Sequence, residues 1–158
     1  MLEREMHFME MTIALARQGM DEGMGGPFGA IVVKGDEIIG QSCNKVTSTN
    51  DPTAHAEVLA IREACRKIGS FQLSGCEIYT SCEPCPMCLG AIYWARPDRV
   101  YYASTREDAA AICFDDSLIY DEIMKPPASR RIPMQQIGHA AAWRVFEAWR
   151  NKEDKISY

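Results

Sequence analysis

The chain opens with a helical pattern of apolar positions. Between residues 2 and 20, apolar side chains recur at spacings of three and four residues, at Leu2, Met6, Met9, Ile13, Ala16 and Met20. Charged residues stand between them, so this spacing predicts an amphipathic helix that covers a core with one face. Three glycines and a proline between residues 23 and 27 end the pattern.

Strand-like and helix-like patterns then alternate along the chain. Runs typical of strands fall at 28–33, 37–43, 77–81 and 99–103, and Lys34-Gly35-Asp36 joins the first two as a hairpin. Helical spacing covers residues 51–68, with Asp51-Pro52 at its start, and residues 85–96, which Pro97 ends. This alternation predicts an α/β protein.

The patterns are weaker after residue 103. They predict short helices over 107–112 and up to Met124, a proline-rich connector over 125–133, and a last helix over 139–150. The last helix has an aromatic stripe, which is more typical of core or interface packing than of a ligand site. The stripe consists of Trp143, Phe146 and Trp149.

The composition is that of one globular domain. The chain has 158 residues, of which 47% are hydrophobic and 25% charged, so we expect a single domain over 1–158. The formal net charge of −5 disfavours a nucleic-acid partner, because phosphate backbones attract basic proteins. No apolar run approaches about 18 residues, and the first residues do not resemble a signal peptide, so we expect a cytoplasmic protein with no membrane contact.

Three of the seven cysteines cluster between residues 82 and 88. In a chain that is long enough to form its own core, an odd and clustered set favours metal binding or catalysis over disulfides. An iron–sulfur cluster of the bacterial ferredoxin type is disfavoured, because the fourth cysteine would fall at Ile92. Two alternatives remain: Cys82 as a fourth ligand of a structural zinc, or a redox pair of two cysteines.

Two short motifs point to a specific chemistry. His55-Ala56-Glu57 stands near one predicted helix start, and Pro84-Cys85-Pro86-Met87-Cys88 stands at another. Either motif alone is weak, since a lone His-x-Glu is usually surface and a lone Cys-x-x-Cys has several uses. Together they match the H-x-E…P-C-x-x-C signature of zinc-dependent nucleobase deaminases.

The spacing of these residues suits a catalytic zinc. Cys85 and Cys88 are three residues apart and therefore share one helix face, where the helix N-terminus favours thiolates. His55 adds a third ligand, which leaves a fourth position for water. Zn²⁺ lowers the pKa of such a water. We expect Glu57 to take its proton, pass it to a ring nitrogen and then protonate the departing amine. Because two thiolates cancel the charge of Zn²⁺, the site suits a neutral heterocycle.

Longer blocks at 25–30, 49–57, 79–96 and 114–117 carry a resemblance to a family. The chain resembles the cytidine deaminase superfamily and, within it, the bacterial guanine deaminases, over about Gly25 to Tyr120 and more loosely to Tyr158. The zinc blocks are shared with cytosine and tRNA-adenosine deaminases, which remain the alternatives. The block Phe114-Asp115-Asp116-Ser117 and the Tyr158 end favour guanine.

The resemblance implies both a fold and a site. It implies a three-layer α/β/α sandwich with a five-stranded mixed sheet, and a homodimer in which segment 126–158 can be exchanged between subunits. It also implies the conversion of guanine to xanthine and ammonia with one Zn²⁺ per chain. Zinc would be held by His55, Cys85 and Cys88, the catalytic acids would be Glu57 and Asp116, and the base would contact Phe28, Asn44, Ala56, Trp94, Asp116 and Tyr158.

Simpler interpretations of these residues stay open. Phe28 and Trp94 can be core aromatics, Asn44 can be a turn residue, and the pair Asp115-Asp116 can cap a helix. The family tends to have glycine before Phe-Asp-Asp, whereas this chain has Cys113. Which of the two aspartate side chains faces the base is therefore open. A zinc-stabilised interaction module without enzymatic activity is the alternative of another class.

Overall fold

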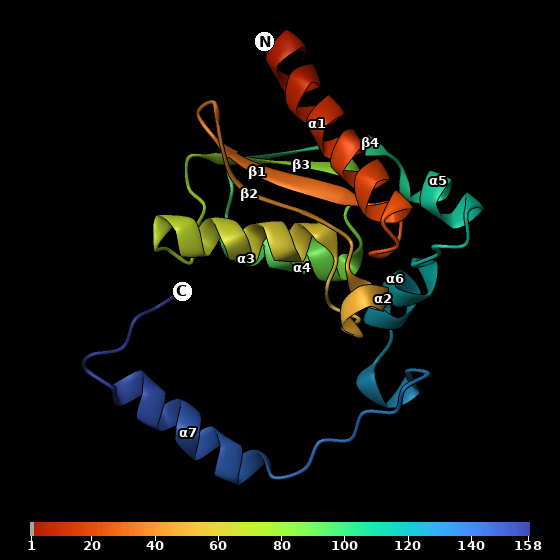
Figure 1. The fold of residues 1–158 in the computed structure, drawn as a ribbon. Coiled ribbons are helices and arrows are strands. Elements are labelled where there is room, and N and C mark those ends of the chain that lie inside the picture. The colour runs from red at the N-terminus through yellow and green to blue at the C-terminus, as the bar shows by residue number, and fades with distance from the viewer. Residues whose placement is uncertain (1) are drawn as a thin grey trace. The chain divides into compact units, whose positions relative to one another are not determined.

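Four strands form one mixed sheet in the computed structural model, which describes residues 2–158 (Figure 1). The strand order is β2-β1-β3-β4. Strand β1 (Gly29–Lys34) is antiparallel to β2 (Glu37–Cys43) and to β3 (Cys76–Cys82), whereas β3 is parallel to β4 (Arg99–Ser104). All four strands that the sequence pattern predicts are therefore present.

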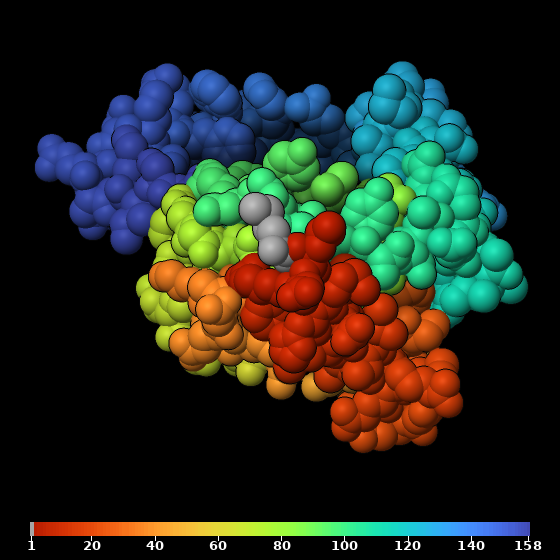
Figure 2. Space-filling view, turned by 90° about the horizontal axis from the view of Figure 1, so that it is seen from above, coloured from red at the N-terminus to blue at the C-terminus, as the bar shows by residue number. Residues whose placement is uncertain are grey.

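Helices cover both faces of the sheet. Helix α1 (Leu2–Asp21) lies on one face, and α3 (Ala56–Ile68) and α4 (Pro86–Ala95) lie on the other (Figure 1). Figure 2 views the molecule from the α1 side. Each face has its own core, which Phe8 and Tyr79 represent on the α1 side and Ala60 and Ile78 on the other. The predicted α/β class and the three layers are confirmed.

The start of α3 differs from the prediction. The helix begins at Ala56, with His55 as its N-cap in extended conformation, and not near Asp51. The Asp51 Oδ1 atom instead accepts hydrogen bonds from the Thr53 amide at 2.8 Å and the Thr53 hydroxyl at 2.7 Å. This side-chain turn competes with helix formation. A short helix, α2 (Val46–Thr49), lies between β2 and α3, where the sequence pattern predicts no helix.

The expectation of a five-stranded sheet is wrong for the described residues. After β4, residues 105–158 form only helices and irregular segments: α5 (Arg106–Ala111), α6 (Ser117–Met124), the 3₁₀ turn η1 (Pro127–Ser129) and α7 (His139–Asn151). A capping box starts α5, because the Thr105 hydroxyl accepts from the Asp108 amide and the Asp108 carboxylate accepts from the Thr105 amide. The chain thus turns into a helix where a further strand would have to follow.

The chain divides into two compact units, Met1–Asp116 and Ser117–Tyr158. The first unit contains the sheet and all of the buried core. In the second unit neither α6 nor α7 has a buried residue, and the aromatic stripe of α7 is exposed. None of the helices within residues 2–158 is both long and apolar enough to span a membrane.

Candidate metal centre and active site

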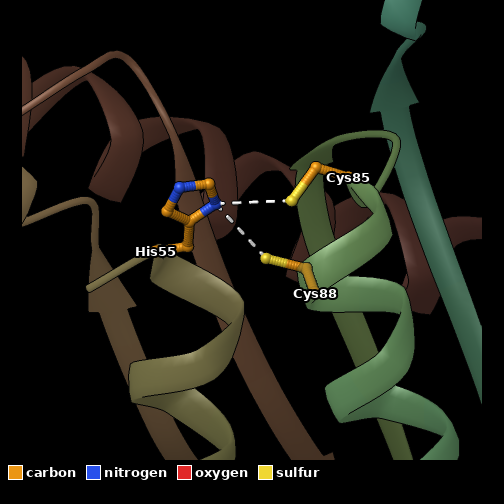
Figure 3. Close-up of side chains that lie close together, drawn as sticks. All are labelled: His55, Cys85 and Cys88. Carbon is orange, nitrogen blue, oxygen red and sulfur yellow. Dashed lines mark hydrogen bonds between the residues drawn. The ribbon is translucent and has the colours of Figure 1, made fainter. Parts of the chain in front are cut away.

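Three side chains from the starts of two helices meet in the first unit. His55 is the N-cap of α3, Cys85 is the N-cap of α4, and Cys88 lies in the first turn of α4. The His55 Nδ1 atom is 3.6 Å from Cys85 Sγ and 3.4 Å from Cys88 Sγ (Figure 3). The three ligand atoms lie within 4.8 Å of one another. Among the described residues, these three side chains form a group that can hold a metal ion.

The spacing of these atoms fits zinc. A zinc ion with bonds of about 2.3 Å to sulfur and about 2.1 Å to nitrogen, at a tetrahedral angle, holds those two ligands about 3.6 Å apart. The observed separations of 3.6 and 3.4 Å agree with this value. One imidazole and two thiolates are also a preferred zinc donor set, and three protein ligands leave one position open, as in catalytic sites.

The electrostatics of the group favour a cation. Hydrogen bonds from the Cys88 thiol and from His55 lower the pKa of Cys85 to about 4. The same thiolate raises the pKa of His55. Cys88 is completely buried next to this negative charge, so its own pKa is raised. A divalent ion held here would favour the ionised form of both thiols.

Glu57 lies beside the metal group and is not part of it. It is the second residue of α3 and is only 6% exposed. Its Oε1 atom accepts a hydrogen bond from the Thr80 hydroxyl at 3.3 Å. Burial raises the pKa of the Glu57 carboxyl group, because an apolar environment disfavours its charged form. A carboxylate in such a place is suited to accept a proton and to return it.

Asn44 closes the glycine-rich turn before β1. It stands directly after β2 and is 5% exposed. Its Oδ1 atom accepts from the amides of Gly26 at 3.3 Å and Val46 at 3.1 Å. A side chain at Gly25 would come within 2.3 Å of this Oδ1 atom, so the turn requires glycine there. Asn44 is therefore a turn residue in this structure, and its contact with a base stays a prediction.

An aromatic pair stands next to that turn. The rings of Phe28 and Phe114 meet edge to face, with centroids 4.9 Å apart. A Cβ atom on Gly26 would lie within about 3.1 Å of both rings. Phe28 was predicted from the sequence as a base contact, whereas Phe114 was not, although it belongs to the Phe-Asp-Asp-Ser block. Through this contact the segment after α5, at Phe114, lies against the residue before β1, Phe28.

Cys113 adopts a backbone conformation that favours glycine. Its φ is 70°, in the left-handed region. Its amide donates to Ala110 O at 3.0 Å, and the amide of Phe114 donates to Ala109 O at 3.0 Å. These bonds end α5 at the position where glycine is favoured, because it has no Cβ atom. The backbone turn thus exists in this chain despite the substitution, and it leads directly into Asp115 and Asp116.

The remaining predicted contacts lie in different surroundings. Asp116 has a raised pKa, caused by partial burial and then by the charge of Cys85. Ala56 is fully buried at the start of α3, while Trp94 is 62% exposed near the end of α4. Tyr158 belongs to the second unit. The roles of these four residues toward a base stay predictions.

Cys82 is outside the metal group, and its Sγ lies 3.5 Å from Thr105 O.

The fold and the metal group together define a class of protein. Residues 2–104 match the model of the cytidine and deoxycytidylate deaminase zinc-binding region, and the chain therefore belongs to this family of zinc-binding deaminases. Within it, the chain is similar to the guanine deaminase of Bacillus subtilis, with 54% identity over 151 residues, 96% of this chain and 97% of that protein. The X-ray structure of that enzyme matches this chain with a TM-score of 0.94, and the match covers 96% of this chain and 97% of that one.

Other relatives match a smaller part of the chain. The tRNA-specific adenosine deaminase of Aquifex aeolicus is 42% identical over 98 residues, 62% of this chain and 64% of that protein. A structure of guanine deaminase from Nitrosomonas europaea is 35% identical with a TM-score of 0.65, and it covers 68% of this chain and 63% of its own. These matches support the family and the fold of the sheet unit.

Proposed function

We propose that this protein deaminates free guanine to xanthine and ammonia. The observation that carries the proposal is the extent of the likeness to the Bacillus subtilis enzyme. A match of 151 residues must include most of residues 117–158, whereas the match to the tRNA-specific enzyme covers 98 residues. The segment beyond the sheet unit therefore lies within the match to the Bacillus subtilis enzyme, and this likeness over nearly the whole chain supports guanine as the substrate.

The residues of the site divide the reaction between them. His55, Cys85 and Cys88 would hold Zn²⁺, which supplies a nucleophilic water at neutral pH. Glu57 takes a proton from the attacking water and delivers it to a ring nitrogen. It then takes the remaining proton from the hydroxyl group that the water has added and gives it to the exocyclic amine, which leaves as ammonia while the carbon–oxygen double bond forms. The products are xanthine and ammonia, and one water is consumed.

Other side chains would bind and orient the base. The Asn44 Nδ2 group has no hydrogen-bond partner among residues 2–158 and can donate to an oxygen or nitrogen of the base. Phe28, with Phe114 against it, offers an apolar surface for one face of the ring. Trp94 and Ala56 complete the predicted base contacts. The raised pKa of Asp116 suits a second acidic group near the purine amine.

A panel of bases tests the substrate. We expect the zinc-loaded protein to release ammonia from guanine at least about 100-fold faster, in kcat/KM, than from adenine or cytosine, because a site that binds polar groups of one base rejects bases that lack them. Ammonia release is measured with a coupled assay for each base. Turnover of cytosine alone, or of adenosine in tRNA alone, would show that one of the alternative substrates is correct. Zinc binding with no turnover of any of them would favour the interaction module.

We infer that the protein works as a homodimer in the cytoplasm, where both ligand thiols stay reduced. The support is helix α7 of the second unit, which has no buried residue and exposes Trp143, Phe146 and Trp149. An amphipathic helix without a buried face is stable when a second chain covers it. Exchange of segment 126–158 between two subunits would cover this face and bring Tyr158 to the site of the partner.

Mixed dimers test the exchange. We expect Glu57→Gln and Tyr158→Ala each to leave a tenth or less of the activity, because each removes a different part of one composite site. Equal amounts of the two variants, unfolded and refolded together, should regain about a quarter of the wild-type activity, since half of the dimers then hold one intact site. Light scattering should give twice the 17.7 kDa of the chain. A mixture no more active than Tyr158→Ala diluted twofold would show that Tyr158 acts within its own chain.

A further inference from the structure

A polar side chain interrupts the apolar face of β3 behind the metal group. Alternate residues of β3 point to the α3 side of the sheet, and all of them are buried: Cys76, Ile78, Thr80 and Cys82. Thr80 is 1% exposed, in a place where valine would fill the same volume. A buried hydroxyl costs stability unless it forms a hydrogen bond. Its partners therefore indicate what the hydroxyl is there to do.

The Thr80 hydroxyl has two hydrogen-bond partners, the Glu57 carboxylate beside the metal group and a backbone carbonyl of β3. Its Oγ1 atom is 3.3 Å from Glu57 Oε1 and 3.0 Å from the carbonyl oxygen of Cys82. The sheet holds the second of these, because Cys82 is paired with Ser104 on β4 and the next amide, that of Glu83, donates to Ser104 O at 2.8 Å. Because the hydroxyl has one proton, it donates to one of these acceptors at a time: to Glu57 when the carboxylate is ionised, and to Cys82 O when Glu57 is protonated.

We propose that Thr80 is a positioning residue for Glu57. Glu57 is on the first turn of α3, and its carboxylate could adopt several rotamers around the metal group. The hydroxyl of Thr80 holds Oε1 on the β3 side and so fixes the direction of the carboxylate. When Glu57 carries a proton, Thr80 can accept from it and donate to Cys82 O, so the contact persists through the proton transfers. This inference rests on the proposed deaminase function and adds a residue that the family signature does not contain.

Three variants test the role of the hydroxyl. Thr80→Val removes it at nearly constant volume, and Thr80→Ser keeps it. Thr12→Val is the matched control, because Thr12 is equally buried on the opposite side of the sheet and donates to Phe8 O at 2.8 Å. We expect Thr80→Val to lower kcat about 10- to 100-fold with KM and zinc content unchanged. Thr80→Ser should stay within about threefold of the wild type, and Thr12→Val should lower stability without lowering kcat.

A crystal structure of zinc-loaded Thr80→Val supplies a readout that does not depend on activity. In that structure the Glu57 carboxylate should either be rotated away from β3 or be disordered, while the metal ligands keep their positions. Unchanged kcat in Thr80→Val, an equal loss in Thr80→Ser, or an unmoved Glu57 would each overturn the proposal. The kcat ratio is measured with whichever base the wild type deaminates. If the wild type deaminates none, the proposed function fails and the orientation of Glu57 alone decides the role of Thr80.

Discussion

Glu57→Gln is expected to abolish turnover while the protein keeps its zinc. Glutamine has the same shape and can still contact Thr80 Oγ1, but it cannot accept a proton from water or deliver one to the amine. General acid–base catalysis contributes about 10²- to 10⁴-fold, so we expect kcat to fall roughly 1,000-fold. Because Glu57 is not one of the three ligands, metal analysis should still find one zinc per chain.

Glu63→Gln is the control for this prediction. Glu63 is an exposed residue of the same helix, and its carboxylate accepts a hydrogen bond of 2.8 Å from the backbone amide of Gln41 at the edge of the sheet. We expect this variant to keep its kcat. The melting temperature of both variants should stay close to that of the wild type. Appreciable activity in Glu57→Gln would refute the proton-shuttle role and reopen the zinc-stabilised interaction module.

Cys88→Ala is expected to remove the zinc and, with it, a large part of the stability. Cys88 is fully buried at the start of α4, and a zinc ion held by the three ligands would join this helix to His55 at the start of α3. A ligand present at about 1,000 times its dissociation constant stabilises a folded protein by about 4 kcal/mol. For a chain of this size such a loss lowers the melting temperature by roughly 10 °C. Activity should be lost completely.

Cys76→Ala separates loss of metal from loss of packing. Cys76 is equally buried on the same side of the sheet and is not a ligand, so its replacement leaves a cavity and keeps the zinc. A strong chelator should lower the melting temperature of the wild type and of Cys76→Ala, but should not change that of Cys88→Ala. If the chelator destabilises Cys88→Ala as much as the wild type, then the metal is held elsewhere.

Local patterns in the sequence predicted the elements that depend on local interactions. The four strands and the long helices follow from the periodicity of apolar side chains, and the ends of the hairpin follow from Gly35. The start of α3 was misplaced, because Asp51 and Thr53 form a turn that competes with the helix. The fifth strand came from the resemblance and not from a strand pattern, and the described residues contain no such strand.

The candidate site was predictable to the extent that its residues lie in motifs. His55, Cys85 and Cys88 were identified by spacing, and the structure brings them together. The contact between Thr80 and Glu57 joins residues that are 23 positions apart, and that between Phe28 and Phe114 joins a loop to the end of α5. No periodicity indicates such contacts, because they depend on the order of strands in the sheet and on the helix that covers it.

The positions of the metal ligands along the chain bear on when the site forms during synthesis. The two most distant ligands, His55 and Cys88, are 33 residues apart, and the loop between them contains only α3 and β3. Closing a loop of this length has a modest entropic cost. Because domains tend to fold from the N-terminus as they leave the ribosome, we expect the ligands to bind zinc before α7 is complete. Metal loading of a nascent chain then precedes the proposed pairing of subunits.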